Sequence, residues 1–135
     1  MSLIVPNARE VVILTDFLTP ALTLRLYSND RTPSGNDVAA DYTEVAGGGY
    51  ANKPLTFANW GITGGAPSVG LYNAVQSWIF TGATTAPGTI YGYYITRDSD
   101  GVLMWAERFP SGSAPLVPEN GSSVRITPRI TCESA

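Results

Sequence analysis

A strand-like segment that runs directly into a turn-rich one constrains the fold of this chain most. Leucine recurs at every second position of the first segment, where Leu22, Leu24 and Leu26 alternate with Thr23, Arg25 and Tyr27. This period of two is expected when one face of a strand packs on a core and the other meets solvent or a partner. The stretch from residue 29 to 37 then gathers Asn, Asp, Pro, Ser and Gly, which favour turns. We therefore expect a half-buried strand, after which the chain leaves the sheet.

A short helix is predicted over residues 7–19, before that strand. Asn7 stands three residues before Glu10, which is close to a capping box. An apolar stripe follows at helical spacing: Val11, Leu14 and Leu18, flanked by Val12 and Phe17. Pro6 makes residues 1–6 an expected extended arm.

The remainder of the chain is predicted to consist of strands and turns. The strongest hairpin signal joins residues 88–97 to 102–109 through the turn Asp98–Gly101. Further strands are expected at 42–45, 49–55, 75–81 and 123–131, and less clearly at 55–60. Gly47–Gly49 suggests a bulge or the close approach of another backbone, and Pro128 suggests an edge or a strand end. About seven or eight strands favour one all-β domain over residues 1–135, a jelly roll or related β-sandwich spanning residues 22–131.

Charge is scarce in this chain. Charged residues make up 14%, and Lys53 is the only lysine, against roughly 25% charged residues in average soluble domains. A surface of hydroxyls and amides loses water at lower cost than one of ions, which favours burial in an assembly. An ordinary β domain of low charge fits the composition equally well.

The composition also argues against several classes of function. A net charge of −3 without basic clusters disfavours nucleic acid and anionic membranes as partners. Histidine is absent and Cys132 is the single cysteine, so the commonest general base and metal ligand sets are missing. No apolar run approaches the roughly 20 residues of a membrane span, and no signal peptide is visible. We expect a protein of the cytosol or of a particle assembled there, and the residues disfavour an enzyme.

Several local motifs could carry a chemical function or could be ordinary structural features. The turn Asp98–Gly101 resembles the start of a calcium loop but lacks the distal carboxylate, so a hairpin turn is favoured. Asp37, Asp41 and Glu44 are expected to form a solvated loop face. The stretch Gly47–Lys53 lacks the spacing of a phosphate loop, and a carboxylate pair such as Glu44 and Glu107 cannot be placed from sequence. Large aromatics, namely Trp60, Trp78, Trp105, Tyr91, Tyr93 and Tyr94, are assigned to the core in preference to a sugar-binding face.

The order of five segments carries a family resemblance. These segments are LIVPNARE, LRLYSND, TEVAGGGYANKPL, GTIYGYYITRDSDGVLMWAERF and VRITPRIT. Together they resemble the small cement or decoration proteins of tailed-phage capsids. The resemblance implies a β jelly roll without cofactor or catalysis, present in many copies over junctions between major capsid protein subunits.

From sequence, then, the expected function is a capsid cement protein that clamps the major capsid protein and stabilises the phage head. The expected partners are that protein and further copies of this chain in dimers or trimers, on a virion surface assembled in the host cytoplasm. The alternatives are a tail or fibre component, then a carbohydrate-binding adhesin that uses exposed tryptophans, then an unrecognised hydrolase. The candidate interface residues lie in the arm and in the turn-rich loop: Leu3, Ile4, Val5, Pro6, Arg31, Pro33, Asn36 and Asp37.

Overall fold

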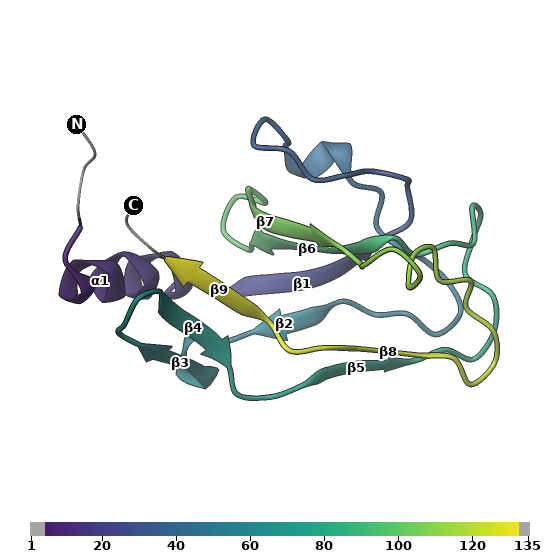
Figure 1. Ribbon diagram of the computed structural model, residues 1–135. Helices are drawn as coiled ribbons and strands as arrows, with labels where there is room; N and C mark the ends of the chain where they lie inside the picture. The colour runs from purple at the N-terminus through teal and green to yellow at the C-terminus, as the bar shows by residue number, and fades with distance from the viewer. Residues whose placement is uncertain (1–4, 133–135) are drawn as a thin grey trace.

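A computed structural model describes residues 5–132 as a mostly β protein with one N-terminal helix and three antiparallel sheets (Figure 1). The helix is α1 (Asn7–Leu18). The strands are β1 (Leu22–Tyr27), β2 (Lys53–Leu55), β3 (Trp60–Thr63), β4 (Ser68–Tyr72), β5 (Gln76–Ile79), β6 (Gly92–Arg97), β7 (Leu103–Arg108), β8 (Ser123–Ile126) and β9 (Arg129–Cys132). Two short 3-10 helices, η1 (Ala39–Asp41) and η2 (Phe57–Asn59), lie between strands. The strands of the described part form no closed barrel.

The largest sheet has the strand order β2-β1-β6-β7. Its β6–β7 pair is the predicted hairpin, in which Ile95 lies opposite Trp105. The turn is built as the sequence indicates, because Gly101 takes a φ of +72°, a conformation that glycine adopts without steric cost. The hairpin prediction is therefore confirmed.

The second layer consists of two smaller sheets, β3-β4-β9 and β5-β8. These lie end to end beneath the large sheet in Figure 1, since β4 leads into β5 and β8 leads into β9. A hydrogen bond from the Tyr72 N–H to the Pro128 carbonyl (2.9 Å) extends the β4–β9 pairing toward the point where β8 ends. The single strand predicted at 123–131 is thus two strands, and Pro128 marks the strand end that the sequence suggested.

One hydrophobic core fills the space between the two layers. It takes side chains from every sheet and from α1: Leu18, Leu22, Leu24, Leu26, Val45, Leu55, Trp60, Tyr72, Trp78, Phe80, Ile90, Tyr93, Ile95, Val124 and Ile126. The alternating leucines of β1 are fully buried, as the period of two predicted. This shared core makes the sheets one packing unit.

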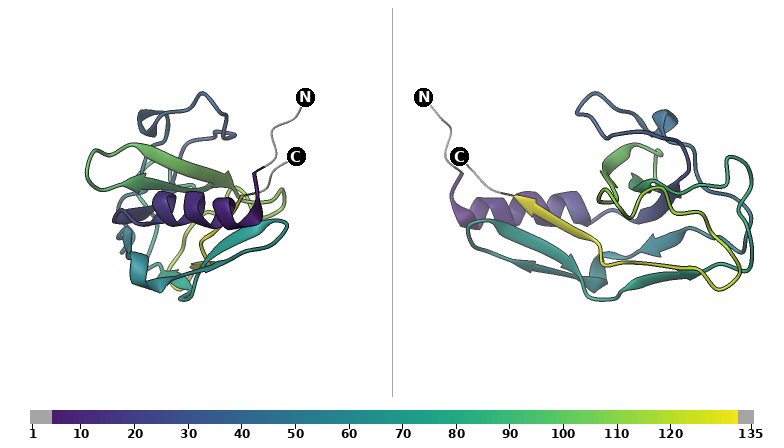
Figure 2. Two further views of the ribbon diagram at one scale, coloured as in Figure 1. Left: turned by 90° about the vertical axis from the view of Figure 1, so that its left-hand side faces the viewer. Right: turned by 45° about the vertical axis from the view of Figure 1, so that its right-hand side comes forward.

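The helix packs on the β3-β4-β9 sheet, at one end of the molecule (Figure 2). Gly70 of β4 permits this approach, because a Cβ there would lie 2.6 Å from Leu18 Cδ1. The apolar stripe is confirmed at Leu14 and Leu18, and the helix ends one residue earlier than predicted. The capping box was wrong: Pro6 is the N-cap, and Glu10 is buried, accepting a hydrogen bond from Ser68 Oγ (3.0 Å).

Two further expectations need correction, and one strand was missed. The outer face of β1 does not meet solvent, because Tyr27 is fully buried and Thr23 is 7% exposed. Of the strands predicted at 42–45 and 49–55, only β2 forms, and of the other predicted positions Glu44 makes an isolated bridge to Tyr27. The strand β4 was not predicted. The close backbone approach at the glycines is confirmed, since a Cβ on Gly48 would lie 2.7 Å from the Gly82 carbonyl oxygen.

Candidate binding surface

The turn-rich segment of residues 28–45, here called the cover loop, returns to the strand that it leaves. At its base the Ser28 N–H donates to the Thr43 carbonyl (2.8 Å). The Asn29 side chain bridges the two arms of the loop, accepting from the Thr43 N–H (2.9 Å) and donating to the Asp41 carbonyl (2.9 Å). The loop therefore closes over the outer face of the four-stranded sheet, on the side away from β5 and β8 (Figure 2).

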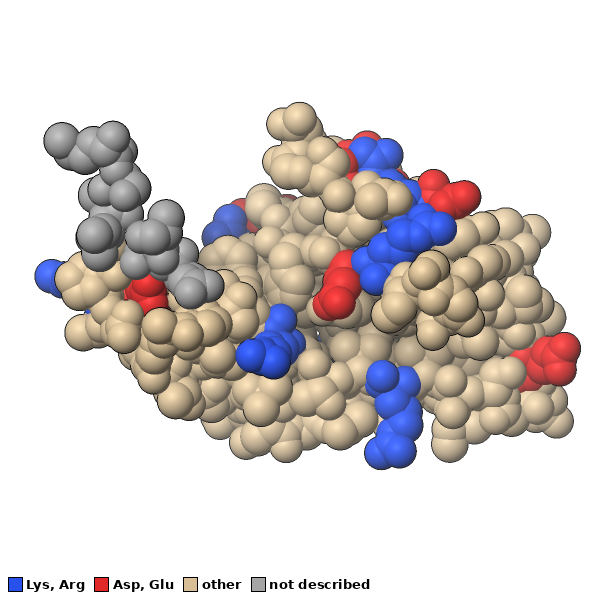
Figure 3. Space-filling model, in the orientation of Figure 1, with Lys and Arg blue, Asp and Glu red and all other residues tan. Residues whose placement is uncertain are grey.

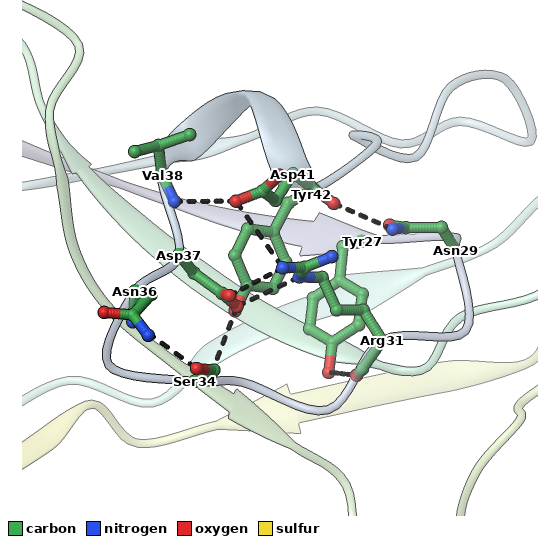
Figure 4. A network of polar contacts seen from close by, with 9 residues as sticks. All are labelled: Tyr27, Asn29, Arg31, Ser34, Asn36, Asp37, Val38, Asp41 and Tyr42. Atoms are coloured by element: carbon green, nitrogen blue, oxygen red, sulfur yellow. Dashed lines mark hydrogen bonds and ion pairs between the residues drawn. The ribbon is translucent and has the colours of Figure 1, made fainter.

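A buried carboxylate organises the interior of the cover loop (Figure 4). Asp37, whose side chain is 2% exposed, binds Arg31 through two contacts of 3.0 Å and 2.6 Å. It also accepts hydrogen bonds from the Tyr42 hydroxyl (2.6 Å) and from the Ser34 N–H (3.2 Å). The Arg31 and Tyr42 hydrogen bonds hold the pKa of Asp37 well below its ordinary value. Asp37 is thus charged and fully engaged within the loop.

Three tyrosines pack beneath this network as a second, smaller core. Tyr42 stacks on Tyr94 with ring centroids 5.2 Å apart and meets Tyr27 edge-on at 5.0 Å. The Tyr27 hydroxyl donates to the Arg31 carbonyl (3.0 Å), which anchors the start of the loop. Burial raises the pKa of Tyr27 and of Tyr94 to about 12. The aromatic cluster explains why the outer face of β1 is covered rather than solvated.

The acidic residues of the loop do not form the solvated face that was expected. Asp37 is paired as described, and Asp41 lies 3.5 Å from Arg31. Glu44 binds Arg25 of β1 through contacts of 2.9 Å and 2.7 Å. Within residues 5–132, no group of three or more His, Cys, Asp or Glu side chains is placed to hold a metal ion. Glu44 therefore holds the loop on β1, whereas Asp37 and Asp41 bind within the loop.

The structure brings four of the candidate interface residues together in the cover loop: Arg31, Pro33, Asn36 and Asp37. Asn36 is exposed, whereas Asp37 points inward. Pro6 is exposed at the start of α1, and Val5 is half-buried. Leu3 and Ile4 lie outside the described residues. The described end of the arm is thus at the end of the molecule where α1 packs, away from the cover loop (Figure 1).

Sequence reasoning missed the edge of the large sheet, β7, as part of this surface. A hollow of about 380 Å³ separates the cover loop from β7 and is lined by residues that include Pro33, Tyr42 and Ala106. A second hollow, of about 500 Å³, lies between β7 and α1 and is lined by residues that include Ile13 and Phe17. Leu103 and Met104 line both hollows. No sequence signal marks an edge, because the topology decides which strand comes last in a sheet.

The turn that resembled a calcium loop is engaged in the hairpin. The Thr23 hydroxyl donates to the Asp98 carboxylate (2.5 Å), and Asp100 binds Arg97 through contacts of 3.0 Å and 2.6 Å. Both carboxylates therefore act within the sheet.

The tryptophans pack on neighbouring groups rather than offering flat faces. Trp60 is 8% exposed and Trp78 4% exposed, which confirms their assignment to the core. The Trp78 indole N–H donates to the Ala51 carbonyl (2.6 Å). Trp105 is half-buried and stacks on Phe17 with ring centroids 5.7 Å apart.

Comparison with protein-family models, with curated proteins and with solved structures finds no match to this chain. Among the described residues, no helix has the length and apolarity that a membrane crossing requires. The functional argument therefore rests on the surface itself.

Proposed function

We propose that this chain is a structural protein of a phage capsid, a cement or decoration protein that clamps neighbouring major capsid protein subunits and stabilises the head. The observation that carries the proposal is a preformed surface that combines the pinned cover loop with the apolar edge of β7. A clamp needs such a surface to be rigid before binding, because ordering a loop on contact reduces affinity.

The charge distribution supports burial of this surface against a partner. Arg31, Arg97 and Arg108 each bind an aspartate of the same molecule. In Figure 3 the charged side chains of one face gather mainly around the cover loop, where the pairs of Arg31 and Arg108 lie, and much of the rest of that face is uncharged. Because these ions already have partners, docking need not leave a charge unpaired, and hydroxyl and amide groups can exchange water for protein.

The finer parts of the proposal follow the family resemblance. The two-layer arrangement would be a jelly roll or a related sandwich. Copies would associate in dimers or trimers at the capsid surface, assembled in the host cytoplasm, each adding modest contacts that sum through multivalency. No cofactor, nucleic acid or membrane enters this function. A tail or fibre role stays open as the alternative, and the packed tryptophans give an adhesin no aromatic platform of their own.

Add-back to purified heads that lack the protein tests the proposal. Asn36 is the sharpest probe because it is exposed and its side chain takes no part in the Asp37 network. We expect Asn36→Arg to keep the melting temperature and to reduce head occupancy, since it places bulk and charge at the docking face. Asn120→Arg, a matched change on the exposed turn before β8, should leave occupancy unchanged.

Two results would overturn the proposal. The first is that neither the native protein nor the Asn120→Arg variant binds to the heads at saturation. The other is localisation of the protein to a few sites on the tail in intact particles, which would favour the alternative.

A further inference from the structure

The edge of β8 that faces away from β5 is open to pairing with another strand. Among the described residues β8 pairs with β5 alone, in a regular antiparallel register. The carbonyl of Ser122, just before β8, accepts a hydrogen bond from the Phe80 N–H (2.8 Å), so Ser122 faces the β5 side. Peptide groups of successive strand residues point to opposite edges, so those of Ser123 and Arg125 point away from β5. They present donors and acceptors to a further strand.

A hollow of about 480 Å³ lies beside this edge. It is lined by Ser123–Arg125 of β8 and by residues of the segment 109–117. Phe109 and Leu116 line the hollow and pack against the main core. Val117 also lines it and is 59% exposed. The hollow therefore combines apolar side chains with hydroxyl and backbone groups next to the open edge.

The charge of this hollow is positive. Of the described residues that line it, Arg125 alone is charged. Its side chain lies on the exposed face of β8, where its neighbour across the β5–β8 pair is Ser77. No carboxylate of the described residues binds Arg125, whereas four other arginines each bind one. Its guanidinium is therefore available to a carboxylate from another molecule.

We propose that this edge docks an extended segment of a partner protein, antiparallel to β8, in which apolar and acidic residues alternate. Successive side chains of an added strand point to opposite faces. Those on the same face as Val124, which is 7% exposed, meet the apolar walls. Those on the face of Arg125 are exposed, and an Asp or Glu directly opposite Arg125 gains an ion pair with it. The contact stands independently of the capsid role.

The open backbone groups favour an extended segment over a small carboxylate. Ser123 and Arg125 each direct one N–H and one carbonyl outward, at positions about 7 Å apart along the strand. A small acid binds the guanidinium alone, whereas an extended segment also pairs with these groups. Main-chain hydrogen bonds then supply affinity, and the alternate side chains supply specificity.

Titration of isotope-labelled protein with acetyl-Val-Asp-Val-Asp-Val-amide tests the proposal. Valine favours the extended form, and the two aspartates share one face. We expect the amide chemical shifts of Ser123 and Arg125 to change at millimolar peptide, and Arg125→Glu to weaken binding about tenfold. Arg129→Glu is the matched control and should bind the peptide as the native protein does. Arg129 is exposed on β9 and does not line the hollow.

Modified peptides separate strand pairing from charge attraction. Acetyl-Val-Lys-Val-Lys-Val-amide should bind Arg125→Glu more tightly than the native protein. In antiparallel pairing, the residue directly opposite Arg125 exchanges both backbone hydrogen bonds with it. N-methylation of the two aspartates should therefore abolish binding, whereas N-methylation of the valines should retain it.

Three results would overturn the inference. The first is an absence of shift changes at Ser123 and Arg125 while the spectra show folded protein. The second is equal binding of the acidic peptide to the native protein and to Arg125→Glu. The third is binding that survives N-methylation of the aspartates, since the peptide would then not pair with β8 in the proposed way.

Discussion

Truncation of Tyr42 should detach the cover loop while leaving the main core intact. Its ring is 5% exposed and contacts Tyr27 and Tyr94 at centroid distances of 5.0 Å and 5.2 Å. Large-to-small changes of buried aromatics cost about 3 to 5 kcal/mol, and we expect about 3 for Tyr42→Ala because the loop above can relax. Amide hydrogen exchange measures the local opening of the cover loop. The Ser28 N–H, bonded to the loop at Thr43, should exchange on the order of a hundredfold faster.

Two comparisons make the Tyr42 prediction refutable. Tyr42→Phe keeps the ring and loses only the hydroxyl bond to Asp37, so it should cost about 1 kcal/mol. The Ile90 N–H, which is bonded to Leu116 away from the loop, should keep its exchange rate in both variants. If Tyr42→Phe costs as much as Tyr42→Ala, the polar network rather than the ring holds the loop. If the Ile90 amide accelerates equally, the loop is not a separate unit.

Two further predictions follow from buried phenols and from a glycine. Because the pKa values of Tyr27 and Tyr94 are raised to about 12 from an ordinary 10.0, their contribution to stability is complete below pH 10 and is lost as the pH rises toward 12. Tyrosinate absorbance and unfolding should therefore rise together in that window, and phenolate formed by these residues in a folded protein near pH 10 would contradict it. Gly48→Ala should destabilise by about 2 kcal/mol in denaturant titrations, since Gly48 has a φ of +62° and a Cβ would lie 2.7 Å from a carbonyl oxygen. Gly35→Ala, with nothing within 4 Å, is the control and should change stability little.

Local sequence signals predicted the elements whose formation depends on their own residues. The β6–β7 hairpin carries its turn in Asp98–Gly101 and its strand preference in flanking aromatic and β-branched residues. The buried leucines of β1 needed only the period of two. The helix needed only its apolar stripe, since the capping box that was expected at its start does not form.

Elements defined by distant partners escaped prediction. β4 contains Gly70 and follows Pro67, which reads as a loop, yet it is a strand because β3 and β9 pair with it on both sides. Glu10 matched a helix cap, but its partner Ser68 is 58 residues away. Local pattern carries no information on either contact.

The candidate surface also combines features that the sequence predicted with features that it did not. Turn-forming residues placed the start of the cover loop correctly after β1, but the inward direction of Asp37 depends on Arg31 and Tyr42 reaching it in space. An aromatic residue at the outward position Tyr27 was the one available hint that the second face is covered. The open edge at β7 had no signal, because strand order is a property of the whole chain.

The structure shows where the few charged residues of this chain are used. Four of the eight basic residues bind carboxylates of the same molecule, in the pairs Arg25–Glu44, Arg31–Asp37, Arg97–Asp100 and Arg108–Asp30. Every one of these pairs holds the cover loop or the β6–β7 hairpin. Partly exposed ion pairs add little to global stability, but here they fix the shape of the two elements that border the β7 edge. The few charges thus shape the candidate surface while leaving hydroxyl, amide and apolar groups to meet a partner.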